Sequence, residues 1–205
     1  MKLPIFYPIL DVETARRRGV ACLDAASQIL DAGARILQFR CKGFFSREIF
    51  ADVEKIANLC SRAGAIFVMN DRVDIAKLLG APVHLGQEDL PPSEARRIFN
   101  GCIGYSTHNE AQLRAAASEP ADYLAFGPIF GTASKLNPDP VVGIAELRRL
   151  RALTDRPVVA IGGITRQNAR GVIEAGADSV AVIGDLFPED SRIGDRVKEW
   201  CEICR

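Results

Sequence analysis

The stretch "AIFVMNDRVDIAKLLGAPVHLGQED", Ala65 to Asp89, decides the fold. It begins with an apolar run that ends at Asn70, and a second apolar run, "PVHLG", comes shortly before its end. Residues 72–79 lie between the runs and have the pattern of a short helix closed by glycine. The stretch therefore predicts strand, helix and strand in succession. It also places Asp71 and Asp89 just beyond the ends of two consecutive strands.

The same unit recurs along the whole chain. Helices close with Ala-Gly directly before a strand in "DAGAR", "RAGAI" and "EAGAD". Strands are expected at 4–10, 34–40, 65–70, 82–86, 102–106, 122–127, 157–162 and 178–184, and helices at 21–32, 47–63, 72–79, 92–98, 109–117, 143–154, 166–175 and from about 189, with a short extra element at 12–19. Several strands are continuous apolar runs, which is typical of a sheet covered on both faces.

Strand–helix pairs that repeat without a linker predict an α/β fold, a (β/α)8 TIM barrel, as a single compact domain over residues 1–205. A doubly wound open sheet is the alternative. That fold is disfavoured because no G-x-G-x-x-G follows the first strand.

Composition limits the classes of function. The chain has 205 residues, 48% of them hydrophobic, and a net charge of zero, which argues against disorder and against a nucleic-acid partner. No apolar run is long enough to span a membrane. The first residues lack the layout of a signal peptide. We therefore expect a cytoplasmic protein that acts on small molecules, and we leave open an oligomer of identical subunits.

Six scattered cysteines do not predict disulfides in such a protein. Cys201 and Cys204 form a C-x-x-C, which we interpret as ordinary cysteines of the last helix. Cys41 lies between Arg40 and Lys42. These cations would lower the pKa of its thiol and favour oxidation, although its side chain is expected to point away from them.

In a barrel of this type the active site forms from the loops at the carboxyl ends of the strands. Gln38, Arg40 and Lys42 alternate along the end of the second strand and therefore share one face. Two cations facing the mouth of the barrel predict an anion site there.

A second anion site is predicted after the seventh and eighth strands. The segments "IGGIT" and "VIGDL" carry Gly163 and Gly184, which would let backbone amides approach an oxyanion. Glycines that only serve tight turns are the alternative. The loop after the sixth strand is long, carries Thr132, Ser134 and Lys135, and has the length of a lid or binding loop.

Asp71 and Asp89 fit a magnesium site better than an acid–base couple. Mg²⁺ is commonly held by one or two carboxylates together with substrate phosphates. With Arg40, Lys42 and Lys135 nearby, metal and cations together could hold a pyrophosphate. Each aspartate could instead cap the helix that follows it.

Seven segments, found in order from about Tyr7 to Ile183, resemble the thiamine phosphate synthase family. They are "QFRCK", "NDRVDIA", "HLGQEDLP", "GYSTHN", "DYLAFGPIFGTASK", "AIGGIT" and "GADSVAVI". The resemblance implies a (β/α)8 barrel. It also implies a magnesium-dependent transferase that joins 4-amino-2-methyl-5-hydroxymethylpyrimidine diphosphate to thiazole phosphate, carboxylated or not, and releases pyrophosphate by a dissociative path through a pyrimidine cation.

The resemblance also implies roles for individual residues. Asp71 and Asp89 would hold Mg²⁺, and Arg40, Lys42 and Lys135 would be catalytic. The pyrimidine diphosphate would be bound by Gln38, Phe39, Arg40, Cys41, Lys42, Asn70, Ser106 and Lys135, and the thiazole phosphate by Thr132, Ala133, Ser134, Gly163, Ile183 and Gly184.

The sequence departs from the family pattern at three places. Ser134 stands where threonine is usual, Gly184 stands where serine is common, and the run "KLNPDP" is less polar than usual. These departures bear on affinity for the thiazole phosphate more than on the class of reaction.

Two other functions remain as alternatives. The related thiazole tautomerase would use His108 for proton transfer, but it needs neither a metal nor a pyrophosphate site. A non-catalytic sensor of phosphate ligands would bind without turnover. His84 alternates with apolar neighbours and is interpreted as a structural histidine of the barrel interior.

Overall fold

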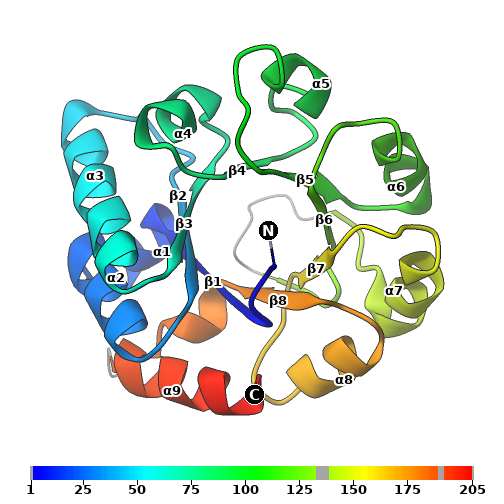
Figure 1. Cartoon of the computed structure of the whole chain (residues 1–205). Helices are drawn as coiled ribbons and strands as arrows, with labels where there is room; N and C mark the ends of the chain where they lie inside the picture. The colour runs from blue at the N-terminus through cyan, green and yellow to red at the C-terminus, as the bar shows by residue number, and fades with distance from the viewer. Residues whose placement is uncertain (1, 133–138, 189–191, 205) are drawn as a thin grey trace.

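The computed structural model describes residues 2–132, 139–188 and 192–204, and in it the strands form one closed parallel barrel (Figure 1). Each strand pairs with its neighbours in chain order, and β8 pairs with β1 to complete the ring. The strands are β1 (Phe6–Asp11), β2 (Ile36–Arg40), β3 (Ile66–Asn70), β4 (Val83–Leu85), β5 (Ile103–Thr107), β6 (Tyr123–Phe126), β7 (Val158–Ile161) and β8 (Ser179–Val182). The predicted fold class is confirmed.

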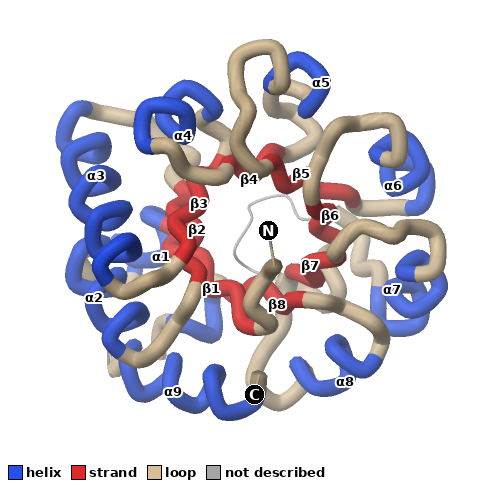
Figure 2. Tube along the Cα trace, viewed as in Figure 1, coloured by secondary structure: helices blue, strands red, loops and turns tan. Residues whose placement is uncertain are grey.

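The helices form a ring outside the strands, as the tube view makes plain (Figure 2). They are α1 (Val12–Arg17), α2 (Cys22–Asp31), α3 (Arg47–Arg62), α4 (Val73–Leu79), α5 (Pro92–Ala95), α6 (Glu110–Ala116), α7 (Gly143–Arg151), α8 (Ala169–Glu174) and α9 (Ile193–Ile203), with a 3₁₀ turn at Gly184–Leu186. The short element predicted at 12–19 is α1.

Helices α5, α7 and α8 are each at least three residues shorter than their sequence pattern predicts, and α7, expected to reach residue 154, ends at Arg151. Helix α5 ends at Ala95, and after it the backbone continues in i→i+3 bonds of the kind that Arg97 donates to Glu94. Helix α8 begins only at Ala169, because residues 165–168 form a turn in which Asn168 Oδ1 accepts from the Thr165 amide. Local side chain–backbone bonds of this kind compete with the first turn of a helix.

The Ala-Gly signatures end helices as predicted. Gly33, Gly64 and Gly176 all have positive φ, as does Gly80 after α4. Glycine adopts this conformation without the steric cost that a Cβ brings, so the chain can turn directly into the next strand.

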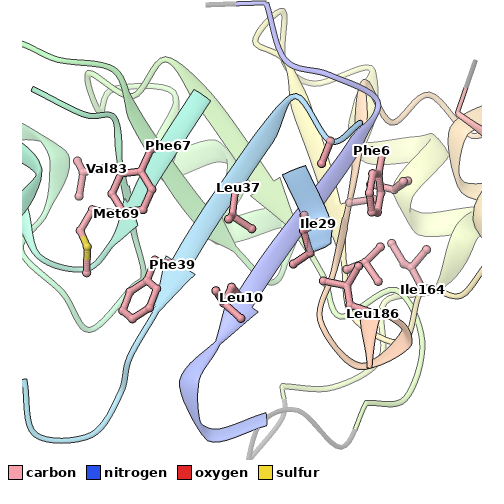
Figure 3. Close-up of a cluster of buried hydrophobic side chains, with 14 of the residues drawn as sticks. Phe6, Leu10, Ile29, Leu37, Phe39, Phe67, Met69, Val83, Ile164 and Leu186 are labelled. Atoms are coloured by element: carbon pink, nitrogen blue, oxygen red, sulfur yellow. The ribbon is translucent and has the colours of Figure 1, made fainter. Parts of the chain in front are cut away.

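The apolar residues divide into two layers. An outer layer lies between strands and helices, and it includes Leu10, Leu37 and Phe39 from the first two strands together with Ile29 of α2 (Figure 3). An inner layer fills the barrel and includes Leu3, Ile9 and Val68. Alternate residues of one strand therefore serve opposite layers, which is why the strands have continuous apolar sequences.

Among the helices of the described residues, none is both long enough and apolar enough to cross a membrane.

Candidate active site

Two neighbouring strands bring the predicted carboxylates together. Asp71 directly follows β3, and Asp89 lies in the loop after β4. Lys42, beyond the end of β2, places its ammonium 2.6 Å from Asp71 Oδ2 and 4.0 Å from Asp89 Oδ1. The structure thus gathers both acids and one of the predicted cations at the carboxyl end of the barrel.

Neither aspartate caps the helix that follows it. Helix α4 begins after Arg72 and helix α5 after Pro91, and neither helix has a side-chain cap. Asp89 Oδ2 instead accepts a hydrogen bond of 2.7 Å from the Gly86 amide. The capping alternative is therefore wrong, and the two carboxylates are available to a ligand.

Asp71 has an unusual backbone. Its φ is +64°, the only positive value of a non-glycine residue in the described part of the chain. Its amide donates to the His84 carbonyl at 2.8 Å, and the flanking amides of Arg72 and Val73 donate to carbonyls two residues back. Left-handed non-glycine residues cost free energy and cluster at functional sites.

The two aspartates share a hydrogen bond, and their pKa values are shifted in opposite directions. Burial and a hydrogen bond with Asp89 raise the pKa of Asp71 to about 6, even though Lys42 opposes the shift. The pKa of Asp89 is held below its usual value, against the effect of its burial, by the hydrogen bonds it accepts from Asp71 and Gly86. Two carboxylates that compete for one proton at close range form a site that favours a cation.

Asn70, the last residue of β3, has a buried amide nitrogen that finds no partner. The residue is only 6% exposed. A buried donor without an acceptor is costly, and such a group in a native protein calls for an explanation. A ligand that supplies acceptor oxygens beside the aspartates would satisfy it.

The end of β2 behaves only partly as predicted. Gln38 points into the barrel and donates to Tyr7 Oη, whereas Phe39 points into the outer layer, so the alternation is confirmed. Because the Phe39 side chain is fully buried there, only its backbone is available to a ligand. The Arg40 guanidinium forms an ion pair with the Asp11 carboxylate, so it does not extend freely into the mouth of the barrel.

Asp11 was not among the predicted site residues. It is the last residue of β1, is almost fully buried, and also accepts from the Thr14 amide as the cap of α1. The signal was present, because Asp11 follows the apolar run "PIFYPIL" just as Asp71 follows "AIFVMN".

The pKa of Cys41 is raised, mainly by burial, and not lowered as the flanking cations suggested. Arg40 turns to Asp11, and Lys42 turns to Asp71. The prediction of an activated thiol is wrong, because both cations are engaged with carboxylates on the other face of the strand.

The two histidines have different surroundings. His84 on β4 is buried, which confirms the predicted interior position, and its ring nitrogens contact Ser106 Oγ and Tyr123 Oη. His108, after β5, places Nδ1 2.6 Å from the Gly127 carbonyl and 3.5 Å from Asp139. Because a carbonyl can only accept, Nδ1 of His108 carries a proton.

The second anion site lies where β7 and β8 end. Gly162 and Gly163 both have positive φ, and a Cβ on Gly163 would lie 2.4 Å from the Gly131 carbonyl oxygen. Ile183 and Gly184 lead from β8 into the 3₁₀ turn. The loop after β6 therefore lies directly against the glycines. Thr132 is half-buried in that loop, whereas Ala133, Ser134 and Lys135 lie outside the described residues.

Magnesium would have to bind here with few protein ligands. No group of three or more His, Cys, Asp and Glu suited to a metal occurs among the residues that the structure describes. The hydrogen-bonded pair Asp71 and Asp89 still fits Mg²⁺, because this ion commonly takes one or two carboxylates and completes its shell with phosphates and water. Lys42 shows that a cation is accommodated between them.

Comparisons with known proteins agree with one another. The family model described as thiamine monophosphate synthase matches residues 6–186. A thiamine-phosphate synthase from Koribacter versatilis is 43% identical over 208 residues, which cover 99% of this chain and 97% of the relative. One from Methanoculleus marisnigri is 42% identical and covers 88% of this chain and 90% of its own length.

A solved structure supports the same family. The thiamine phosphate pyrophosphorylase from Pyrococcus furiosus superposes with a TM-score of 0.85 at 33% identity, and the match covers 97% of this chain and 94% of that one. The "Native KDPGal" structure has a TM-score of 0.73 at 17% identity, which shows the shared fold alone. The chain is an enzyme of the transferase class, and it belongs to the thiamine monophosphate synthase family.

Proposed function

We propose that this enzyme joins 4-amino-2-methyl-5-hydroxymethylpyrimidine diphosphate to thiazole phosphate, with or without its carboxyl group, to give thiamine phosphate and pyrophosphate. The carboxyl group, where the thiazole carries one, leaves as carbon dioxide. Membership of the family supports the reaction. The observation that carries it is the buried, unpartnered Asn70 amide nitrogen beside Lys42 and the hydrogen-bonded carboxylates of Asp71 and Asp89. That arrangement suits a diphosphate, which supplies both acceptor oxygens and negative charge.

The residues of β2, β3 and β5 would bind the pyrimidine diphosphate. Gln38 and Ser106 face the interior and would contact the ring, while Asn70 would donate to the diphosphate. Lys42 would leave the carboxylates for a phosphate oxygen when the substrate and Mg²⁺ enter, and Arg40 lies on the same face of the strand. Lys135 keeps its proposed role at the pyrophosphate, although it lies outside the described residues.

Mg²⁺, held by Asp71 and Asp89, would neutralise charge on the leaving pyrophosphate. The chain's own part is to hold that group in place: Lys42 and the Asn70 amide bind its oxygens as negative charge develops there. The bond between the pyrimidine methylene carbon and the diphosphate oxygen breaks, and the electron pair leaves with pyrophosphate. The thiazole nitrogen then supplies the pair for the new carbon–nitrogen bond.

The thiazole phosphate would bind at the ends of β7 and β8. The Gly163 amide and the backbone of Ile183 and Gly184 would hold the phosphate, together with Thr132 to Ser134. Water must stay out while a cation exists, and the loop after β6 packs directly on Gly163. A cytoplasmic location and a homo-oligomer stay predictions.

The test is to incubate the purified protein with both substrates and Mg²⁺ and to follow thiamine phosphate and pyrophosphate. We expect both products in equal amounts, and neither in EDTA. Asp89→Ala should abolish this turnover in a protein that still melts cooperatively. Turnover near the wild-type rate in that variant would refute the metal role of Asp89.

The same assay separates the alternatives. A tautomerase would leave both substrates unjoined and would isomerise the thiazole phosphate in EDTA, with proton transfer at His108. A phosphate sensor would bind thiazole phosphate in calorimetry and form no product.

A further inference from the structure

A chain of hydrogen bonds crosses the inside of the barrel behind the site. Gln38 Nε2 donates to Tyr7 Oη at 2.9 Å, and Tyr7 Oη lies 2.9 Å from Tyr123 Oη. Tyr123 Oη lies 3.1 Å from His84 Nδ1, and His84 Nε2 lies 2.9 Å from Ser106 Oγ. Five side chains from five different strands are thus linked, and Tyr7 and Tyr123 are each only 1% exposed.

One arrangement of the protons makes every hydrogen bond and also gives both tyrosine protons an acceptor. An amide nitrogen can only donate, so Tyr7 accepts from Gln38 and passes its own proton to Tyr123. Tyr123 then donates to His84 Nδ1, which leaves the imidazole proton on Nε2, where it is donated to Ser106. If the hydrogen bonds ran in the reverse direction, Tyr7 would accept two of them. Its own hydroxyl proton would then have no acceptor among these five side chains.

Both tyrosine hydroxyls keep their protons. Burial raises the pKa of Tyr7 and of Tyr123, so both remain neutral donors. A second ring proton on His84 would remove the acceptor that the Tyr123 hydroxyl has at Nδ1.

A glycine in β5 makes room for the central tyrosine. His84, Gly104 and Tyr123 stand side by side in the register of β4, β5 and β6. A Cβ on Gly104 would lie 2.0 Å from Tyr123 Cζ and 2.4 Å from its hydroxyl oxygen. The Tyr123 ring therefore passes over Gly104 to reach His84, and the two rings lie with centroids 5.6 Å apart at an interplanar angle of 25°.

We propose that Gly104, Tyr123 and Tyr7 are positioning residues, which fix the His84 proton on Nε2 and so hold Ser106 as a hydrogen-bond donor toward the substrate. Ser106 accepts from His84, and its own proton is directed out of the chain to an acceptor atom of the ligand. A nitrogen heterocycle with an in-plane lone pair meets this requirement. The identity of this ligand rests on the proposed function, which places the pyrimidine ring at Ser106.

The first test needs no turnover. In a long-range ¹H–¹⁵N spectrum of the imidazoles at pH 8, only His84 and His108 contribute. We expect His84 as the Nε2–H tautomer and His108 as the Nδ1–H tautomer, since His108 Nδ1 faces the Gly127 carbonyl. Tyr123→Phe should convert His84 to a mixture of tautomers and leave His108 unchanged. An Nδ1–H tautomer or an imidazolium at His84 in the wild type would overturn the inference.

The second test measures the consequence for the substrate. Tyr123→Phe keeps the ring over Gly104 and removes only the hydroxyl, so we expect the KM for the pyrimidine diphosphate to rise about tenfold with the KM for thiazole phosphate unchanged. Gly104→Ala should do the same by displacing the ring. Tyr105→Phe is the matched control, because Tyr105 lies on β5 beside Gly104 but is not one of the five hydrogen-bonded side chains. It should leave the KM values for both substrates unchanged.

The outcomes separate the inference from the proposed function. A lower melting temperature in Tyr123→Phe with both KM values and the His84 tautomer unchanged would show a purely structural role and refute the inference. The expected tautomers in a protein that forms no thiamine phosphate would refute the proposed function and retain the positioning of Ser106. In that case binding of the pyrimidine diphosphate, measured by calorimetry in wild type and Tyr123→Phe, decides whether Ser106 serves that ligand.

Discussion

At the scale of single residues, Asp71 combines a left-handed backbone, a raised pKa and a lysine partner. Each feature opposes stability or is neutral to it, and together they suit a cation and its phosphate ligand. Natural proteins commonly depart from local rules at sites that function requires.

Asp71→Asn should stabilise the metal-free protein and remove its response to Mg²⁺. Asparagine tolerates positive φ, and its amide can donate to Asp89 as the protonated acid does. A raised pKa means that Asp71 contributes stability below about pH 4, which is lost as the pH rises through about 6. The variant should therefore exceed the wild type by roughly 1 kcal/mol at pH 7.5 and by less at pH 5.

Thermal unfolding in EDTA at the two pH values measures this difference. Added Mg²⁺ with pyrophosphate should raise the melting temperature of the wild type and leave that of the variant unchanged. A variant that is less stable than the wild type at pH 7.5 would contradict the idea that the two carboxylates repel each other.

Asn70→Ala separates binding from stability. The buried amide nitrogen has no partner within the protein, so removal of the amide should change the free energy of unfolding by less than about 1 kcal/mol. The KM for the pyrimidine diphosphate should rise about tenfold, because the diphosphate loses a buried donor. The exposed Asn100, changed to alanine, is the control for kinetics and melting. Equal KM values in both variants would remove Asn70 from the site.

At the scale of the elements, the loop after β6 is held against the end of β7. Phe130 donates to the Gly162 carbonyl at 3.0 Å, and Ile129 donates to the Ile161 carbonyl at 2.9 Å. Two consecutive glycines with positive φ allow this approach. The sequence indicated a phosphate loop here, but the tight contact between two separate loops could not be inferred from the segment "IGGIT" alone.

Gly163→Ala should destabilise the protein and weaken thiazole phosphate binding together. The new Cβ would meet the Gly131 carbonyl oxygen at 2.4 Å, and φ is +62°. We expect a loss of about 2 kcal/mol in the free energy of unfolding and a higher KM for thiazole phosphate. Gly171→Ala in α8 is the matched control, because its Cβ would lie 3.5 Å from Ile144 Cδ1, so its stability should be equal or higher. Equal stability of the two variants would refute the close packing of these loops.

At the scale of the whole molecule, the two ends of the barrel carry different kinds of residue. The carboxyl ends of the strands carry Asp11, Asp71 and Asp89, whereas the residues before β1 close the opposite end with Leu3. The barrel separates residues that serve the site from residues that serve stability.

Leu3→Ala should therefore lower stability without affecting the reaction. Leu3 is 8% exposed and packs in the inner layer with Tyr7 and Ile9, so its truncation should cost about 2 kcal/mol. Denaturant unfolding measures the loss, and steady-state kinetics well below the melting temperature should give unchanged KM values for both substrates. A changed KM would mean that packing at this end reaches the site.

The sequence by itself determined the order of strands and helices, the fold class and the position of the aspartates past β3 and β4. These features depend on local periodicity and on glycine, which act over a few residues. It also indicated a shared face for Gln38 and Arg40. The order of residues did not show that Arg40 would pair with Asp11 of the neighbouring strand. Nor did it show that burial would raise the pKa of Cys41.

Only the tertiary structure decided which polar groups meet. Tyr7 and Tyr123 are separated by 116 positions, and each reads as an apolar strand residue. Closure of the barrel brings their hydroxyls together and aligns them with His84 and Ser106, while the gap left by Gly104 fixes the direction of the ring. The physical reason is that buried polar groups must find partners, and in a closed barrel those partners come from strands that are distant in the chain.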